Sequence, residues 1–226
     1  MVDFSKSNLN KKKKTKGQTL IDLYSDRSTD SLLGANVIQI KRYSDEELYG
    51  GLNQEQSLMV KDIRDYLKGR TENRFFLVQG GGGTGKSFSI NRALKGINPR
   101  QVIAAAPSHF AKNVLQNFLG KLYKVTTIAA LLGKKVTFND EGKQILVRIS
   151  KKMTPPIEKY PVILIDEGSM VNDETANEIL DYVIKGDKAL IILGDYCQLP
   201  PVNQPHDALF FDNISAELNI PMRFTG

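Results

Sequence analysis

The sequence predicts an α/β fold in which a parallel sheet carries helices on both faces. Short continuous apolar runs bounded by turn residues are typical of parallel strands buried on both sides, and five occur, at 75–78, 102–106, 125–128, 162–165 and 189–193. Helical patterns lie between several of them, at 87–94, 108–119 and 172–184. Alternating strands and helices indicate right-handed crossovers, and ligands of such sheets bind at the carboxyl ends of the strands.

Composition bounds the class of protein before any motif is considered. The 226 residues are 41% hydrophobic, which is enough for a sizeable core, and no apolar run approaches the roughly 18–20 residues of a membrane span. The single cysteine, Cys197, excludes an intramolecular disulfide and a cysteine-cluster metal site. We therefore expect a cytoplasmic protein with one main domain over residues 51–226.

Residues 1–50 form a polar, basic N-terminal extension that we expect to be partly disordered. Its segment from Lys11 to Lys16 carries five lysines and no acid. Such a run is typical of a solvated arm, of a nucleic-acid contact or of an import signal, and the sequence leaves all three open. The stretch 31–49 either adds a strand or packs on the domain.

We expect ordered structure to start at Gly51, with a helix after Asn53. Asn53 is a plausible N-cap, and Gln56 three residues later completes the pattern of a capping box. Apolar residues then recur at helical spacing until Gly69.

The segment from Gly80 to Ser87 reads GGGGTGKS and follows the first apolar run. This is the G-x-x-x-x-G-K-S/T phosphate loop in its strand–loop–helix setting. Glycines let backbone N–H groups close around a polyphosphate, and the following helix directs its positive end at the same phosphates. Lys86 is predicted to reach the β- and γ-phosphates, and the Ser87 hydroxyl to bind Mg²⁺. The predicted nucleotide-binding residues of the loop are Gly81, Gly82, Gly83, Thr84, Gly85, Lys86 and Ser87.

Two later strands each deliver polar residues at their carboxyl ends. The run at 162–165 leads into Asp166 and Glu167, which is the Walker B arrangement. Asp166 is expected to hold Mg²⁺ through water, and Glu167 to orient and deprotonate the attacking water, since adjacent residues at a strand end point differently. After the last run, Gln198 precedes two prolines that would stiffen it as a hydrogen-bond donor to the γ-phosphate or the water.

One segment interrupts the α/β rhythm. Two short runs separated by Asn139–Gly142 predict a β-hairpin at 135–149, within an insertion at 133–155. The stretch from Lys112 to Lys152 around it carries nine basic residues against two acids, a net charge of +7. Basicity confined to one segment favours contact with a polyanion.

In order, the motifs resemble the first RecA-like domain of a superfamily-one DNA helicase, and they are most similar to the 5′-to-3′ branch that contains RecD and the phage Dda helicase. The resemblance covers about residues 51–226. The motifs that carry it are GLNQEQ (51–56), GGGGTGKS (80–87), AAPSHFAK (105–112), TTIAALL (126–132), LIDEGSM (164–170), GDYCQLPPV (194–202) and PMRF (221–224).

The resemblance implies ATP and Mg²⁺ as ligands and single-stranded or forked duplex DNA as partner. Gln56 would read the adenine edge, Gln198 would sense the γ-phosphate, and Arg223 would reach that phosphate from the domain junction as arginine fingers do. The hairpin resembles the strand-separating pin of this branch, and its aromatic Phe138 either stacks on a base or packs on the domain. The DNA-contacting residues implied by the family are Ser108, His109, Thr126 and Thr127, although His109 is also compatible with a helix cap.

Two departures from the family bear on function. Ala129 stands where family members often have histidine, so that DNA contact is not expected. The sequence ends three residues after Arg223, without a second RecA-like domain. It therefore reads as a piece of a longer helicase or as a natural half that works with a partner protein, in the host cytoplasm if phage-encoded. The alternative function is a non-motor ATP- and DNA-binding module that completes or regulates a partner.

Overall fold

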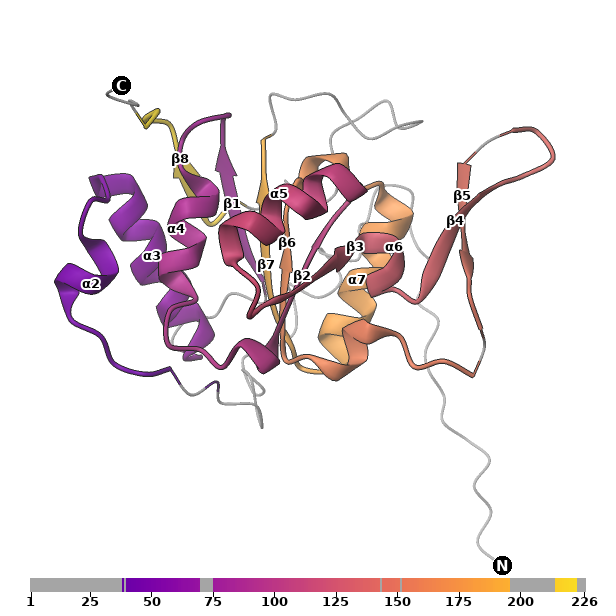
Figure 1. Ribbon diagram of the computed structural model, residues 1–226, viewed down its shortest axis with the longest axis horizontal. Helices are drawn as coiled ribbons and strands as arrows, with labels where there is room; N and C mark the ends of the chain where they lie inside the picture. The colour runs from indigo at the N-terminus through magenta and orange to yellow at the C-terminus, as the bar shows by residue number, and fades with distance from the viewer. Residues whose placement is uncertain are drawn as a thin grey trace, which may run out of the picture.

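The computed structural model describes residue 38 and residues 40–69, 75–142, 144–150, 152–195 and 214–222. Its centre is a six-stranded sheet with the order β3-β2-β6-β7-β1-β8, in which all neighbouring strands run parallel (Figure 1). The strands are β1 (Phe76–Gly80), β2 (Val102–Ala106), β3 (Lys124–Thr127), β6 (Val162–Ile165), β7 (Ala189–Gly194) and β8 (Ala216–Leu218).

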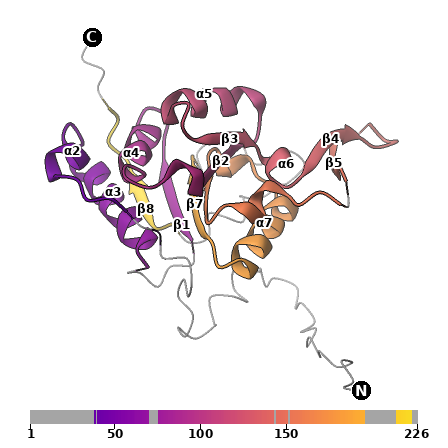
Figure 2. The same ribbon diagram turned by 60° about the horizontal axis from the view of Figure 1, so that its bottom comes forward.

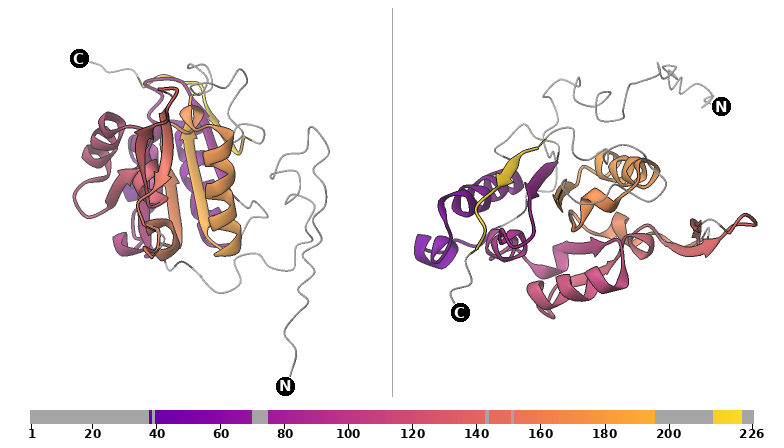
Figure 3. Two further views of the ribbon diagram at one scale, coloured as in Figure 1. Left: turned by 90° about the vertical axis from the view of Figure 1, so that its right-hand side faces the viewer. Right: turned by 90° about the horizontal axis from the view of Figure 1, so that it is seen from above.

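Helices cover both faces of the sheet, and the alternation of side chains along each strand supplies one core to each face (Figure 3). On β1, Val78 belongs to the core under the helices on one face, whereas Leu77 belongs to the core on the other. The first core is covered by α3 (Gln54–Leu67), α4 (Lys86–Ala93) and α5 (His109–Leu119), and the second by α6 (Ile128–Leu131) and α7 (Asp173–Lys185).

The predicted α/β class is confirmed, and the five predicted strands lie within two residues of their expected bounds. The expected capping box at the start of α3 is also present, because Asn53 and Gln56 exchange backbone-to-side-chain hydrogen bonds. The sequence analysis missed β8. Short 3-10 turns complete the domain, at η1 (Pro99–Gln101), η2 (Pro156–Lys159) and η3 (Gly168–Met170).

Ordered structure begins before Gly51, so that expectation was wrong. A short helix, α2 (Asp45–Tyr49), starts at a capping box formed by Ser44 and Glu47, and Ile38 is buried in the core. Of the two readings of this stretch, its described residues follow the second: they pack on the domain and form no strand.

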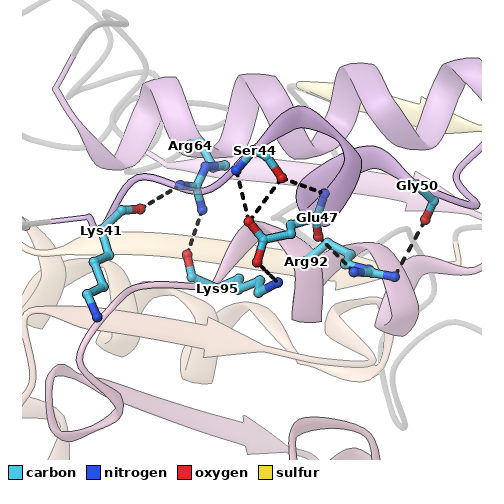
Figure 4. Close-up of polar contacts among 7 residues, drawn as sticks. All are labelled: Lys41, Ser44, Glu47, Gly50, Arg64, Arg92 and Lys95. Carbon is cyan, nitrogen blue, oxygen red and sulfur yellow. Dashed lines mark hydrogen bonds and ion pairs between the residues drawn. The ribbon is translucent and has the colours of Figure 1, made fainter.

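Buried and half-buried arginines hold this segment in place by donating to backbone carbonyls (Figure 4). Arg64 of α3 donates to the carbonyl of Lys41 at 3.4 Å and to that of Lys95 at 2.7 Å. Arg92 of α4 donates to the carbonyl of Glu47 at 2.8 Å, while the carboxylate of Glu47 lies 3.5 Å from Lys95 Nζ. These arginine side chains thus satisfy backbone carbonyls of a segment that is not part of the sheet.

The predicted hairpin is present as an antiparallel pair, β4 (Lys134–Phe138) and β5 (Gln144–Arg148), and it projects away from the sheet (Figures 1 and 2). Its base is fixed by two contacts. The N–H of Ile149 donates to the carbonyl of Gly133 at 3.0 Å, and Lys134 forms an ion pair with Glu178 of α7. Beyond that base, apolar side chains such as Val136 remain exposed.

Candidate nucleotide-binding site

The phosphate loop joins β1 to α4 at the carboxyl edge of the sheet. Gly83 and Gly85 have φ angles of 78° and 82°, which glycine adopts without strain. A Cβ at Gly85 would also lie 2.5 Å from Gln56 Nε2, so glycine is required there by packing. Side chains at Gly81 and Gly82 would meet no protein atom within 4 Å and need no unusual φ. These two glycines therefore leave room for something outside the protein.

Lys86 is the first residue of α4, and its side chain turns back over the loop. Its Nζ donates to the carbonyl of Gly80 at 2.5 Å and to that of Gly81 at 3.0 Å. The hydroxyl of Thr84 donates to the same Gly81 carbonyl at 2.8 Å. The half-buried Ser87 follows in the first turn of the helix. The loop thus concentrates one ammonium group and a helix N-terminus, both of which attract phosphate.

Gln56 holds the loop from the side of α3. Its side chain is 1% exposed, its Nε2 donates to the carbonyl of Thr84 at 2.9 Å, and its Oε1 accepts from the N–H of Asn53 at 3.1 Å. The amide therefore serves as a strut between the helix start and the loop. Its second Nε2 hydrogen and second Oε1 lone pair are the groups left for a base, and the adenine contact stays a prediction.

Asp166 and Glu167 follow β6 at the same edge of the sheet, where β7 separates β6 from β1. The N–H of Asp166 donates to the carbonyl of Ala105 at 2.9 Å, which extends the sheet by one residue. Glu167 has a φ of 54°, a left-handed conformation that costs a non-glycine residue about 1–3 kcal/mol. Backbone strain of this kind is concentrated at functional sites, and here it falls on the residue directly after Asp166.

Burial raises the pKa of the Asp166 carboxyl to about 6, and the neighbouring charge of Glu167 acts in the same direction. Two effects oppose this rise in pKa: the hydrogen bond from the Glu167 N–H, at 3.0 Å, and the positive charge of Lys86. The influence of Lys86 on the pKa of Asp166 means that the loop and the carboxylates share one electrostatic environment.

The donors at this edge fit Mg²⁺. Magnesium prefers oxygen ligands and is usually held by one or two protein groups together with water and substrate phosphates. Ser87 supplies a hydroxyl, and Asp166 supplies a buried carboxylate whose ionised form a cation would favour. Within the described ranges no group of three or more His, Cys, Asp or Glu side chains forms a closed metal cage.

The structure brings the predicted DNA-contacting residues to neighbouring strand ends, because Ala106 of β2 pairs with Thr127 of β3. Ser108 caps α5 by accepting from the N–H of Ala111 at 3.1 Å, and Thr127 caps α6 by accepting from that of Ala130 at 3.2 Å. The cap of α5 is thus Ser108 and not His109, which corrects the alternative reading of His109. His109 is exposed, and Thr126 is half-buried.

Phe138 lies on the hairpin, apart from these strand ends, and is 68% exposed. Its alternative role, packing on the domain, is therefore wrong. Gln198, Arg223 and the lysine run at 11–16 lie outside the described residues, so their expected roles stay predictions.

Sequence reasoning missed two features of this edge. The hydroxyl of Ser169 lies two residues after Glu167, is buried, and has no hydrogen-bond partner among the residues that the structure describes. The chain at 219–222 contacts both the loop and the start of α3. No local pattern marks either feature, because both depend on tertiary contacts.

A separate pocket of about 1090 Å³ lies between the N-terminal segment, α4 and the turn before β2. Lys41, Lys95 and Tyr123 are among its lining residues, and no residue from 81 to 87 lines it. We place the nucleotide site at the loop and not in this pocket, because phosphate is recognised by backbone N–H groups and a lysine at a helix start.

Comparison with known proteins identifies the family of the chain. Residues 51–217 match the family model AAA_30, described as an AAA domain. An uncharacterized protein of Acanthamoeba polyphaga mimivirus is 27% identical over 183 residues, which is 70% of this chain and 35% of that protein. No helix within the described residues is long and apolar enough to cross a membrane.

Solved structures of Pif1 helicases share the fold. A structure of two coordinating Pif1 helicases at forked double-stranded DNA has a TM-score of 0.54 and 24% identity, over 77% of this chain and 45% of that one. Bacteroides Pif1 bound to single-stranded DNA has a TM-score of 0.51 and 23% identity, over 77% and 43%. Candida albicans Pif1 has a TM-score of 0.51 and 21% identity, over 76% and 40%.

The chain therefore spans less than half the length of these helicases, and the shared part is the RecA-like fold that carries the phosphate loop. From the match over residues 51–217, the chain belongs to the AAA_30 family of AAA domains.

Proposed function

We propose that this chain is the ATP-hydrolysing first motor domain of a 5′-to-3′ DNA helicase. In the complete helicase, hydrolysis would drive translocation along single-stranded DNA and unwinding of the duplex. The fold shared with Pif1 helicases supports the proposal, since one such structure holds ADP-AlF4 and others hold single-stranded or forked DNA.

One observation carries the proposal. Lys86, in the helix that follows the β1 phosphate loop, and Asp166, directly after β6, lie at the carboxyl edge of one parallel sheet, where β7 is the one strand between β1 and β6. The next residue, Glu167, is held in a strained left-handed conformation. A phosphate-binding lysine, a carboxylate for a cation and a separately oriented second carboxylate are the groups that hydrolysis of a nucleoside triphosphate requires.

Each group has a role in that reaction. The N–H groups of the loop and the Lys86 ammonium bind the phosphates and offset the charge that develops on them. Ser87 and Asp166 would hold Mg²⁺, which would supply positive charge to offset the charge that develops on the phosphates. Glu167 orients a water molecule and accepts its proton. Gln198 and Arg223 complete the proposed set as γ-phosphate sensor and arginine finger.

The DNA-contacting surface is proposed at the carboxyl ends of β2 and β3. Ser108, His109, Thr126 and Thr127 lie at these neighbouring strand ends, within the stretch of net charge +7. Hydroxyls and backbone groups at helix starts are common contacts to the phosphates of nucleic acids. Because β2 pairs with β6, the strand that leads to Asp166, the DNA-contacting surface and the Asp166 carboxylate lie on adjacent strands of one sheet edge.

Single-turnover hydrolysis of ATP, with and without single-stranded DNA, tests the proposal. We expect a measurable rate that DNA increases, and the loss of that rate in Glu167→Gln. Glu174→Gln is the matched control, because Glu174 is exposed on the next helix and undergoes the same chemical change. Nucleotide binding without hydrolysis under either condition would instead identify a non-motor ATP-binding module.

A further inference from the structure

The chain between 214 and 222 lies against the nucleotide site although it is distant in sequence. Strand β8 pairs with β1 in parallel, so that Leu218 lies opposite Gly80 at the start of the phosphate loop. The chain then passes the first turn of α3. There the N–H groups of Asn219 and Ile220 both donate to Oε2 of Glu55, at 2.8 Å and 3.0 Å.

Two residues further, the same segment contacts the loop itself. The N–H of Met222 donates to the carbonyl of Gly83 at 2.8 Å. The sulfur of Met222 lies 2.5 Å from where a Cβ of Gly85 would be, so the side chain rests directly on the loop. The loop therefore has a backbone and a side-chain contact with residue 222.

The carboxylate of Glu55 is well placed to hold such a segment. Glu55 lies in the first turn of α3, where a negative charge is favoured by the helix dipole. Hydrogen bonds from N–H groups to a charged acceptor are stronger than those to a neutral one. Among the residues that the structure describes, Glu55 has no ion-pair partner, so its bonds to the 219–220 backbone are not shared with a cation.

The first turn of α3 thus forms hydrogen bonds to both the phosphate loop and the segment 219–222. Gln56 holds the phosphate loop through the carbonyl of Thr84, and the adjacent Glu55 holds the 219–220 backbone. The hydrogen bond from the Met222 N–H to the Gly83 carbonyl joins the loop to the segment directly, so α3, the loop and the segment are all connected to one another. The segment 219–222 is thus fixed to α3 at one end and bonded to the loop at the other. When the Gly83 carbonyl moves, we expect Met222 to move with it.

We propose that Glu55 is a positioning residue that couples the phosphate loop to the segment 219–222. This inference rests on the proposed function, because the next residue in sequence is Arg223, the proposed arginine finger. Binding of a nucleoside triphosphate alters the surroundings of the Gly83 carbonyl, to which the Met222 N–H is bonded. Because Glu55 holds the backbone of residues 219–220 in place, residue 222 then takes one defined position.

Amide hydrogen exchange of the whole chain, measured by NMR, tests the contact and the coupling. In Glu55→Ala, the amides of Asn219 and Ile220 should exchange about ten-fold faster or more, because each loses a charged acceptor. Glu55→Gln keeps an oxygen acceptor and should restore most of the protection. Asp62 is an exposed acid on the same helix, and Asp62→Ala should leave the exchange of the Asn219, Ile220 and Met222 amides unchanged.

Saturation with a non-hydrolysable ATP analogue should change the exchange of the Met222 amide at least about three-fold in the unsubstituted chain, and less in Glu55→Ala. If analogue binds and the Met222 amide is unaffected, the coupling is refuted while nucleotide binding stands. If no analogue binds, the proposed function fails, and exchange at Asn219 and Ile220 still decides whether Glu55 holds the segment.

The rate of ATP hydrolysis distinguishes a positioning role from a purely structural one, because a contact that only stabilises the fold would not affect this rate. Misplacing a catalytic group by about 1 Å can lower a rate about 100-fold. Glu55→Ala should therefore lower the single-turnover rate between about 10- and 100-fold with little change in analogue affinity, and Glu55→Gln should recover most of it. Equal rates in the original chain and Glu55→Ala would overturn the positioning role.

Discussion

The phosphate-loop edge, which is proposed to hydrolyse ATP, and the β4–β5 hairpin, whose Phe138 is a predicted DNA contact in addition to the surface at the ends of β2 and β3, are built in opposite ways. At the loop, polar groups are buried or tied to carbonyls, as in Gln56, Thr84 and Lys86. On the hairpin, Val136 and Phe138 are exposed, and the fixed contacts lie at its base.

The difference follows from what each region does. Chemistry on a phosphate requires groups held to within a fraction of an ångström, which only elements packed in the core provide. A surface that contacts a long polyanion is governed by charge and exposed rings, and it tolerates looser positioning. Substitutions at the loop edge should therefore act on catalysis and stability, whereas those on the hairpin should act on DNA affinity alone.

The largest effect is expected for Glu167→Gln. The amide keeps the shape of the side chain and cannot accept a proton, so hydrolysis should fall about 10²- to 10⁴-fold while nucleotide affinity is retained. Rapid-quench single-turnover assays with radiolabelled ATP measure the rate. A rate equal to that of the original chain would show that Glu167 is not the base.

The next effect is a gain in stability from Asp166→Asn without nucleotide. Burial raises the pKa of this carboxyl from its ordinary value of 3.8 to about 6, so its ionisation at neutral pH opposes folding. Removing the charge should stabilise the chain by up to about 3 kcal/mol at pH 7.5, measured by urea unfolding.

The pH dependence of that gain identifies its cause. An acid with a raised pKa costs nothing below the unfolded pKa, and its cost grows as the pH rises through the folded pKa. The difference between Asp166→Asn and the original chain should therefore vanish near pH 4 and be complete above about pH 6.5. A gain that is the same at both pH values would have another origin.

The smallest effect concerns the hairpin. Single-stranded DNA should bind weakly, with log affinity falling against log salt by about 0.7 for each phosphate contact. Phe138→Ala should weaken binding by about 1–3 kcal/mol if the ring stacks on a base, and it should leave hydrolysis without DNA unchanged. Fluorescence anisotropy with a labelled oligonucleotide, over a series of salt concentrations, measures both.

Leu122→Ala is the control for this experiment, because Leu122 is 82% exposed and lies outside the hairpin. It should bind DNA as the original chain does. Equal weakening by both substitutions would mean that exposed apolar surface in general, and not the hairpin, contacts DNA. Affinity that does not change with salt would contradict the electrostatic basis of the DNA-contacting surface.

Apolar runs revealed five of the six strands of the sheet. In β1, β2, β6 and β7 every residue is buried, which favours apolar side chains, whereas the edge strand β3 is half-buried and was found from the run that begins at Val125. Apolar runs did not reveal β8, since three residues ending at Leu218 give no period to detect. Helix α2 was also missed, although its capping box at Ser44 and Glu47 is a local signal that could have found it.

The positions of Lys86, Ser87 and Asp166 after the strands β1 and β6 were predictable, since these residues belong to local patterns. The hydrogen bond from the Asn219 N–H to Glu55 joins residues 164 positions apart, and neither local sequence alone predicts it. The buried state of Gln56 was likewise hidden, because its role as a strut depends on how the loop packs against α3.

Binding of a non-hydrolysable ATP analogue with Mg²⁺, measured by isothermal titration calorimetry, tests the central claim most directly. The original chain should bind one equivalent, and Lys86→Ala should abolish binding, because the loop amides remain but the charge of the β- and γ-phosphates is uncompensated. Lys61→Ala, which removes an exposed lysine of α3, should bind as the original chain does. Unchanged affinity in Lys86→Ala would contradict the assignment of the phosphate loop.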